Sequence, residues 1–303
     1  MTPRDSQIEW PTLALIAACT FVWMAATWAA GREGAWPLLA VAALCVTLHS
    51  SLQHEVLHGH PTRSRPVNEA LVFLAPGLFI PYRRFRALHL KHHNDPNLTD
   101  PYEDPETNYM DKADWDRLPW AVQQLREFNN TLVGRVIIGP AVAVVGFVLS
   151  DARQLWAGDR RVWVAWLLHG VGVAIALAWA IGVCGLNLAT YVFAVAYPGF
   201  SLLMVRTFLE HRAEQEVPLR TCIVEDQSGF WGLLFLNNNL HVVHHQDPRV
   251  PWYKLADLYA ANRAGYLGTN GNYKFASYWT IWRNYAFRSK ANVPHPFFNR
   301  DNR

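Results

Sequence analysis

Histidine is the residue type in this chain best suited to chemistry, and the sequence contains 13 of them. Eight histidines form three short clusters: His54 and His58; His89, His92 and His93; His241, His244 and His245. Because spacings of three and four residues bring side chains to one face of a helix, each cluster should present its imidazoles together. Imidazole is a ligand of zinc, copper, iron and nickel. Eight clustered imidazoles exceed the needs of one four-coordinate ion, so the pattern predicts a site for two metals.

The second and third clusters continue in the same way. HLKHHNDP begins at His89 and HVVHHQDP begins at His241, so both end in Asp-Pro. Since proline disfavours helix at the residue before it, each cluster should lie at the end of a helix. Asp95 and Asp247 are then placed to accept a hydrogen bond from the free ring N–H of a ligand histidine. A plain turn role explains the two aspartates equally well.

Two further residues are candidates for the same site. His60 follows His58 by two positions and therefore leaves the shared helical face, which makes it a second-rank ligand. Asn237 lies four residues before His241 on the same face and is a candidate to contact metal-bound water. Four acidic residues follow the second cluster, and a solvated turn is their default interpretation, ahead of outer acids or a docking surface: Asp100, Glu103, Asp104 and Glu106.

The elements that must position these clusters are long and apolar. Charged residues make up 17% of the chain and hydrophobic residues 51%, which is far from an ordinary soluble composition. Four uncharged runs cover residues 11–30, 37–53, 162–182 and 186–205. At about 1.5 Å per residue, runs of this length cross a bilayer core of roughly 30 Å. His169 lies in the third run with no visible partner, which favours an ordinary buried histidine.

The charges between the runs predict an orientation. Basic residues gather between residues 63 and 161, whereas the links 31–36 and 182–185 carry almost no charge. The positive-inside rule therefore places those two links outside and both termini in the cytoplasm. Two shorter apolar runs, 70–81 and 132–150, are interrupted by proline or arginine, and we interpret them as interfacial or re-entrant segments.

Together these patterns predict the fold class. We expect an all-α integral membrane protein with four transmembrane helices in two hairpins, forming one domain over residues 1–303. A cytoplasmic helical cap of residues 54–161 and 206–303 carries the histidine clusters. No basic block of nucleic-acid type is present, and four scattered cysteines without a CxxC motif exclude a disulfide scaffold or a thiolate zinc site.

The three histidine clusters, in this order beside paired apolar hairpins, resemble the membrane di-iron fatty acid desaturase and hydroxylase superfamily. The resemblance covers roughly residues 37–255 and extends to the carotene ketolase and bacterial hydrocarbon oxygenase branches, whose first cluster is also HxxxH. It implies two irons at the cytoplasmic face of a membrane, here a bacterial inner membrane, and the use of O₂ and two electrons on an unactivated C–H bond. It also implies a further ligand after the last span, which His211 supplies in Phe208-Leu209-Glu210-His211.

The resemblance leaves the substrate open. It implies desaturation or hydroxylation of a lipid-like molecule, with a fatty acyl chain favoured and a carotenoid or alicyclic compound as the alternative. With no GxGxxG and no CxxC motif in the chain, electrons are expected from a separate ferredoxin or rubredoxin with its reductase. A membrane metal transporter is the rival class, but its ionisable residues should lie inside the spans. A haem protein is a third possibility and needs facing histidines within spans.

Overall fold

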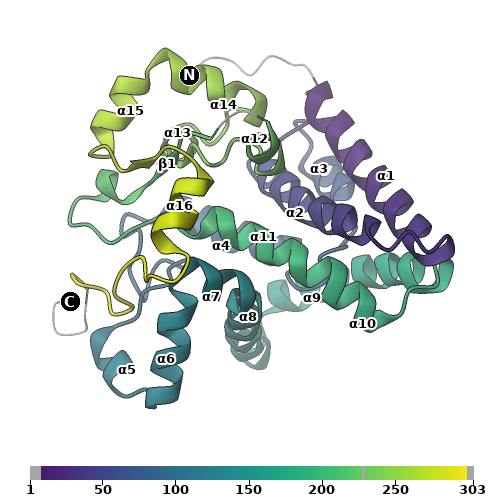
Figure 1. Ribbon diagram of the computed structural model, residues 1–303, viewed down its shortest axis with the longest axis horizontal. Coiled ribbons are helices and arrows are strands. Elements are labelled where there is room, and N and C mark those ends of the chain that lie inside the picture. Colours follow the sequence, from purple (N-terminus) through teal and green to yellow (C-terminus); the bar gives the residue numbers. More distant parts are fainter. Residues whose placement is uncertain (1–7, 227–228, 299–303) are drawn as a thin grey trace.

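The computed structural model describes residues 8–226 and 229–298, and helices dominate it (Figure 1). The N-terminal half contains α1 Trp10–Arg32, α2 Leu38–Leu57, α3 Arg65–Leu71, α4 Tyr82–His93, α5 Lys112–Asp116, α6 Trp120–Asn129, α7 Leu132–Ile137 and α8 Gly139–Trp156. The second half contains α9 Arg160–Leu177, η1 Ala178–Val183, α10 Leu188–Tyr191, η2 Val192–Ala196, α11 Tyr197–Thr207, η3 Val217–Arg220, α12 Phe230–Leu234, α13 His241–Gln246, α14 Trp252–Ala261, α15 Arg263–Thr269 and α16 Tyr278–Tyr285. Strands β1 Ile223–Val224 and β2 Lys274–Phe275 pair in parallel.

Three of the four predicted spans are helices long and apolar enough to cross a membrane. They are Trp10–Arg32, Arg160–Val183 and Leu188–Thr207, the last two continuing through π-helical turns. The fourth, α2, packs against α1 and α11 and covers the predicted run 37–53 (Figure 1). α2 is less apolar than those three helices because its second half carries polar residues, including Gln53 and His54. Its crossing of the membrane therefore stays a prediction.

Residues 72–81 form an irregular segment between α3 and α4, where the sequence predicted an interfacial or re-entrant piece. Its backbone carbonyls accept hydrogen bonds from side chains of the long helices: Tyr191 Oη lies 2.8 Å from the Pro76 oxygen, and His169 Nε2 lies 2.8 Å from the Leu78 oxygen. Such side-chain donors are what irregular backbone requires when water is scarce. They also give His169 the partner that was not visible in the sequence.

The second short run, predicted over 132–150, becomes two helices. The run divides where Gly139 and Pro140 begin α8, since proline fits the first turn of a helix. α8 continues past the predicted end to Trp156, and its residue Asp151 is buried in an ion pair with Arg84, with 2.7 Å between the charged atoms. α8 also exposes Val145, Val148 and Leu149.

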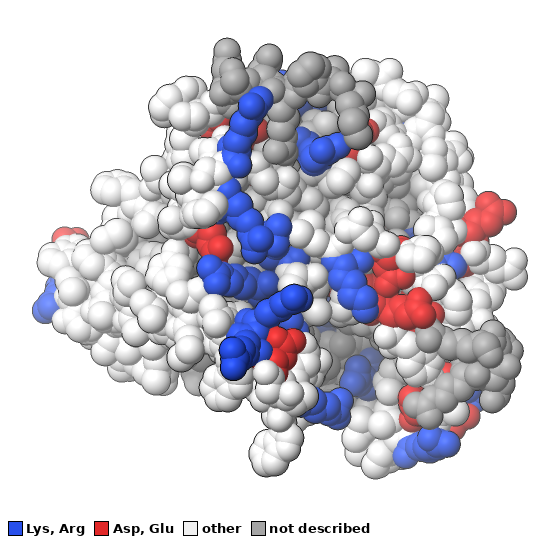
Figure 2. Space-filling model, turned by 180° about the vertical axis from the view of Figure 1, so that it is seen from behind, with Lys and Arg blue, Asp and Glu red and all other residues white. Residues whose placement is uncertain are grey.

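The surface separates apolar from charged regions. Figure 2 shows a large uncharged area at one end of the molecule and a band of Lys and Arg across its middle. The uncharged end belongs to the long apolar helices, whose outward residues include Phe21, Leu167 and Phe193. An apolar end bordered by basic side chains fits association with a membrane.

Candidate metal centre

Four pieces of the chain bring the histidines together. His54 lies in the last turn of α2 and His58 follows its end, α4 ends at His93, α13 starts at His241, and His211 follows α11. The two Asp-Pro pairs act as predicted, because α4 and α13 both end just before them. The imidazole side chains at and near these helix ends therefore lie close together.

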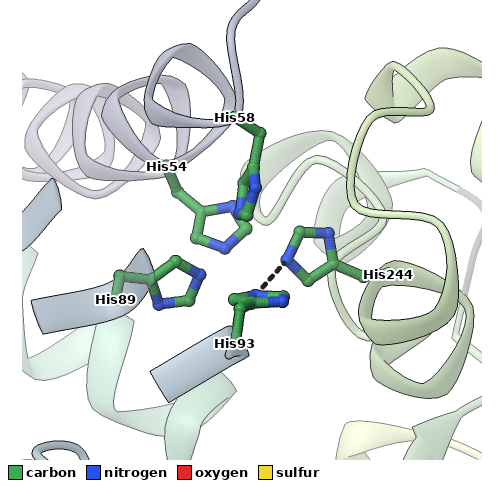
Figure 3. A group of neighbouring side chains, drawn as sticks. All are labelled: His54, His58, His89, His93 and His244. Carbon is green, nitrogen blue, oxygen red and sulfur yellow. Dashed lines mark hydrogen bonds between the residues drawn. The ribbon is translucent and has the colours of Figure 1, made fainter. Parts of the chain in front are cut away.

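The first group contains five histidines whose ligand atoms all lie within 4.8 Å of one another: His54, His58, His89, His93 and His244. Figure 3 shows their rings turned toward a common centre from α2, α4 and α13. The Nε2 atoms of His54 and His89 are buried without a hydrogen-bond partner among the described residues. Nε2 of His93 lies 3.0 Å from Nε2 of His244. Buried ring nitrogens that converge without protein partners fit the place of a metal ion.

The second group contains four histidines under the same limit of 4.8 Å: His92, His211, His241 and His245. Nε2 of His211 lies 3.0 Å from Nε2 of both His92 and His241. Nε2 of His245 lies 3.2 Å from Nε2 of His241. All four converge through the same ring nitrogen, so this group also has the donor set of a metal site.

The two groups are adjacent. In two pairs of consecutive histidines, one residue belongs to each group. His93 belongs to the first group and His92 to the second, just as His244 belongs to the first and His245 to the second. The rings of His93 and His245 stack across the boundary, with centroids 4.2 Å apart. The structure thus brings together all nine predicted ligands, in two adjacent sets that could each hold one ion.

Carboxylates behind the rings fix which nitrogen faces the centre. His89 Nδ1 lies 2.8 Å from Glu106 Oε1, and His92 Nδ1 lies 2.7 Å from Asp104 Oδ1. Since an ionised carboxylate only accepts, Nδ1 must carry the proton in both rings, which leaves the Nε2 lone pair for a metal. Asp104 and Glu106 belong to the acidic stretch whose default interpretation was a solvated turn, and for these two that interpretation is wrong.

Glu210 and Asn238 lie beside His241, a placement that the sequence did not reveal. Glu210 Oε1 lies 3.7 Å from His241 Nδ1, and the Asn238 side-chain amide is 3.3 Å from the same oxygen. Asn238 Oδ1 lies 3.4 Å from His241 Nδ1. Arg206 pairs with Glu210 at 3.2 Å, so the carboxylate is anchored from α11. The position of Glu210 directly before His211 was the one available signal.

Among the described residues Asp95 and Asp247 make no hydrogen bond to a histidine of either group, and the contact of Asn237 with metal-bound water stays a prediction. Asp95 accepts from the backbone N–H of Asn97 at 2.8 Å and so caps a turn, whereas Asp247 ends α13 and makes no side-chain hydrogen bond to a described histidine. The Asn237 amide donates to the Trp252 carbonyl at 3.1 Å, and Asn237 Oδ1 is buried without a hydrogen-bond partner among the described residues. Its backbone has a φ of 53°, so the helical spacing from His241 does not apply.

His60 lies outside both groups, which corrects its second-rank assignment. Its Nδ1 lies 2.7 Å from Glu9 Oε1, ahead of α1. Its Nε2 lies 3.8 Å from Glu55 Oε1, and that oxygen accepts from the Trp252 backbone N–H at 3.0 Å. The backbone turns at Gly59, with a φ of 96°, and carries His60 away from the His58 face. His60 therefore ties the start of α1 to the end of α2.

Burial sets the protonation of the site. It lowers the pKa of His93 to about 3, helped by the neighbouring rings of His89 and His92, and it lowers the pKa of His54 and His244 well below the usual value in the same way. Burial also opposes the charged form of His92, but the Asp104 hydrogen bond and the Glu106 charge outweigh it and raise the pKa of His92 to about 9. The rings of His54, His93 and His244 are therefore neutral, as metal binding requires, whereas His92 must give up its Nε2 proton when a metal binds.

The comparisons with known proteins agree with this geometry. The model of the family described as fatty acid desaturase matches residues 26–277, a range that contains all nine converging histidines. The comparison with curated proteins found no match. Because the family match covers most of the chain, the protein is a member of the fatty acid desaturase family.

Proposed function

We propose that this protein is an O₂-dependent di-iron oxidoreductase of the membrane that desaturates or hydroxylates an unactivated C–H bond of a lipid-like substrate, a fatty acyl chain above all. The observation that carries the proposal is the pair of adjacent histidine groups with converging Nε2 atoms. A nearly all-imidazole donor set without thiolate suits iron, and the four cysteines are buried elsewhere as free thiols. Iron, unlike zinc, can change its redox state and so supply the oxidising chemistry.

The residues of the chain have separable tasks in this proposal. His54, His58, His89, His93 and His244 hold one ion, and His92, His211, His241 and His245 hold the other. Glu106 and Asp104 hold the Nδ1 protons of His89 and His92, which keeps each Nε2 available. Asn238 and Glu210 orient His241 from the other side.

The cavities beside the centre fit an apolar substrate. A cavity of about 490 Å³ is lined by His89 and His211 and by apolar residues of α8 and α11. A second, of about 180 Å³, lies against α2, the 72–81 segment and α11, and its lining is mostly apolar. The two cavities share four lining residues, which are Ile80, Phe85, Phe200 and Leu203. A chain that enters from the lipid could occupy both and pass the histidines.

Orientation and electron supply complete the proposal. The basic band in Figure 2 faces the cytoplasm of a bacterial inner membrane, in accordance with the positive-inside rule. An acidic ferredoxin or rubredoxin, reduced by its reductase, delivers electrons to that face, because opposite charges favour the encounter. The cysteines are dispersed and cannot form an electron-carrying cluster within this chain.

Iron content and oxygen consumption test the proposal. We expect two irons per chain and O₂ uptake that depends on both the donor system and an acyl substrate. Exchangeable zinc without redox activity would instead support a membrane metal transporter. Lipid and pigment profiles of cells that express the wild type or His211→Ala separate acyl products from carotenoid products. Uptake without a donor, or product oxygen that comes from water, contradicts the mechanism.

A further inference from the structure

The larger cavity has a cationic end as well as an apolar wall. Arg126 of α6, Arg135 of α7 and Lys290, which follows α16, all line it. Arg135 is 5% exposed, and its guanidinium donates to the Asn129 carbonyl at 3.1 Å and to Asn108 Oδ1 at 2.6 Å. Lys290 donates to the Phe208 carbonyl, and its Nζ lies 5.3 Å from the Phe208 ring centroid. These partners are neutral, so they orient the cations without cancelling their charge.

The carboxylates that line the same cavity are already engaged. Glu106 and Asp104 bind histidine rings, and Glu210 pairs with Arg206 at 3.2 Å. Within residues 8–226 and 229–298, Arg126, Arg135 and Lys290 form no ion pair with a carboxylate.

The positive charges of these three side chains also repel one another. Burial and the charge of Arg126 lower the pKa of Arg135 to about 10, and burial and the charge of Arg135 lower the pKa of Lys290 to about 7. Gathering like charges in a partly buried wall is costly unless an anion joins them.

The rest of the wall suits a hydrocarbon chain. Val142, Ala143 and Phe147 of α8 and Leu203 and Met204 of α11 line the cavity. His89, His211 and residues 104–109 line it as well. An apolar molecule with one anionic end matches both parts of the lining, whereas an uncharged hydrocarbon or carotenoid leaves the cationic end unused.

We propose that Arg126, Arg135 and Lys290 bind the oxyanion, a carboxylate or a phosphate, at one end of an apolar substrate whose chain lies between α8 and α11. This proposal extends the proposed oxidase function. It depends on that function only in treating the bound molecule as the substrate. By fixing the anionic end in the cap, the three cations determine which carbon of the chain reaches the histidines. Arg126 and Arg135 suit either oxyanion, because guanidinium binds both in a bidentate manner.

Binding measured without oxygen or donor tests the site separately from the chemistry. The full chain in detergent is loaded with a fluorescent anthroyloxy fatty acid, which is displaced by dodecanoate, dodecyl phosphate or dodecanol. We expect at least one anion to displace the probe at a concentration about tenfold or more below that of dodecanol. The comparison of the two anions identifies which head group the site prefers.

Variants test which residues bind the anionic end and which contact the chain. Arg126→Gln is chosen because the Arg126 side chain makes no hydrogen bond or ion pair with a described residue. Its backbone carbonyl accepts from the Asn130 N–H at 3.1 Å, and glutamine keeps that bond, so the fold should tolerate the change. It should reduce the preference for the anions about tenfold and leave dodecanol unchanged. Gly146→Leu should weaken all three ligands, because Gly146 lines the cavity and an added Cβ there meets only open space. Gly170→Leu, a matched change at an exposed open position of α9, should change nothing.

The outcomes separate the two proposals. Dodecanol that binds as tightly as both anions, or an Arg126→Gln variant that keeps the full preference, overturns the anion site. Unaltered binding in Gly146→Leu overturns the placement of the chain along α8. A protein that prefers anions but holds no iron and consumes no O₂ keeps the anion site and loses the oxidase function.

Discussion

His92 Nδ1 lies 2.7 Å from Asp104 Oδ1, and both side chains are only 1% exposed. A buried carboxylate that holds the outer proton of an imidazole keeps the inner nitrogen free and the ring in one orientation. Asp104 follows His92 by twelve positions, and Glu106, two residues further along the same loop, holds His89 in the same manner. The loop after the second histidine cluster is therefore part of the metal centre.

Asp104→Asn should lower iron affinity roughly 10–100-fold while the chain stays folded, because the amide cannot hold His92 in the same charge state. Iron retained during titration with a chelator measures the effect. Asp95→Asn is the matched control, since Asp95 caps a turn and touches no described histidine of the two groups. Equal iron loss in both variants would indicate that Asp95 also supports a ligand histidine.

Adjacent histidines should affect different irons. His244→Ala removes a ligand from the first group and His245→Ala removes one from the second, although the two residues are neighbours in sequence. Each variant should retain about half of the wild-type iron, since one donor set stays intact. Iron quantification and Mössbauer spectra should distinguish the two remaining ions. Identical spectra from both variants would contradict the division into two sites.

The metal-free chain should lose stability as the pH falls below about 6.5. In that range the unfolded chain protonates its histidines, whereas burial keeps the pKa of His93 at about 3 and that of His54 well below its usual value. The unfolded state then binds more protons, so acid favours unfolding. His92 has the opposite sign: its stabilisation is full below about 6.5 and disappears as the pH rises through about 9. Thermal unfolding in detergent between pH 5 and 7 checks the net direction.

Arg206→Met should destabilise the protein by about 3–5 kcal/mol, because it leaves Glu210 buried without its charge partner. The Arg206 and Glu210 side chains are 6% and 12% exposed. Lys112→Met is the control, since the Lys112–Asp116 pair is mostly exposed and an exposed pair contributes about 0–1 kcal/mol. Denaturant titration in detergent compares the two. A similar loss in both variants would show that burial of the Arg206 pair is unimportant.

Reporter fusions should place the two short links outside the membrane. Fusions after residue 33 and after residue 184 are expected to read external, and one near residue 155 is expected to read cytoplasmic, from the distribution of basic residues. The same experiment decides whether α2 crosses. An external result at residue 155 would mean that α8 spans the bilayer.

The sequence by itself determined the mostly helical fold, its long apolar helices and the clustered histidines that converge. Uncharged runs long enough to cross a bilayer predict helices, because only helices or closed barrels satisfy the backbone in lipid. Spacings of three and four predict shared helical faces, and Asp-Pro predicts where α4 and α13 end. These signals are local, so no knowledge of the tertiary structure was needed. His211 is isolated from the clusters and was found only through the family resemblance.

Only the tertiary structure decided which histidines share a group and which residues support them. His92 and His93 are neighbours, yet a helix turns consecutive side chains by about 100° and sends them to different sites. Asp95 stands closer in sequence to these rings than Asp104 does, but only the fold of the following loop brings a carboxylate behind His92. The gathering of Arg126, Arg135 and Lys290 at one cavity likewise depends on packing between segments more than 150 residues apart.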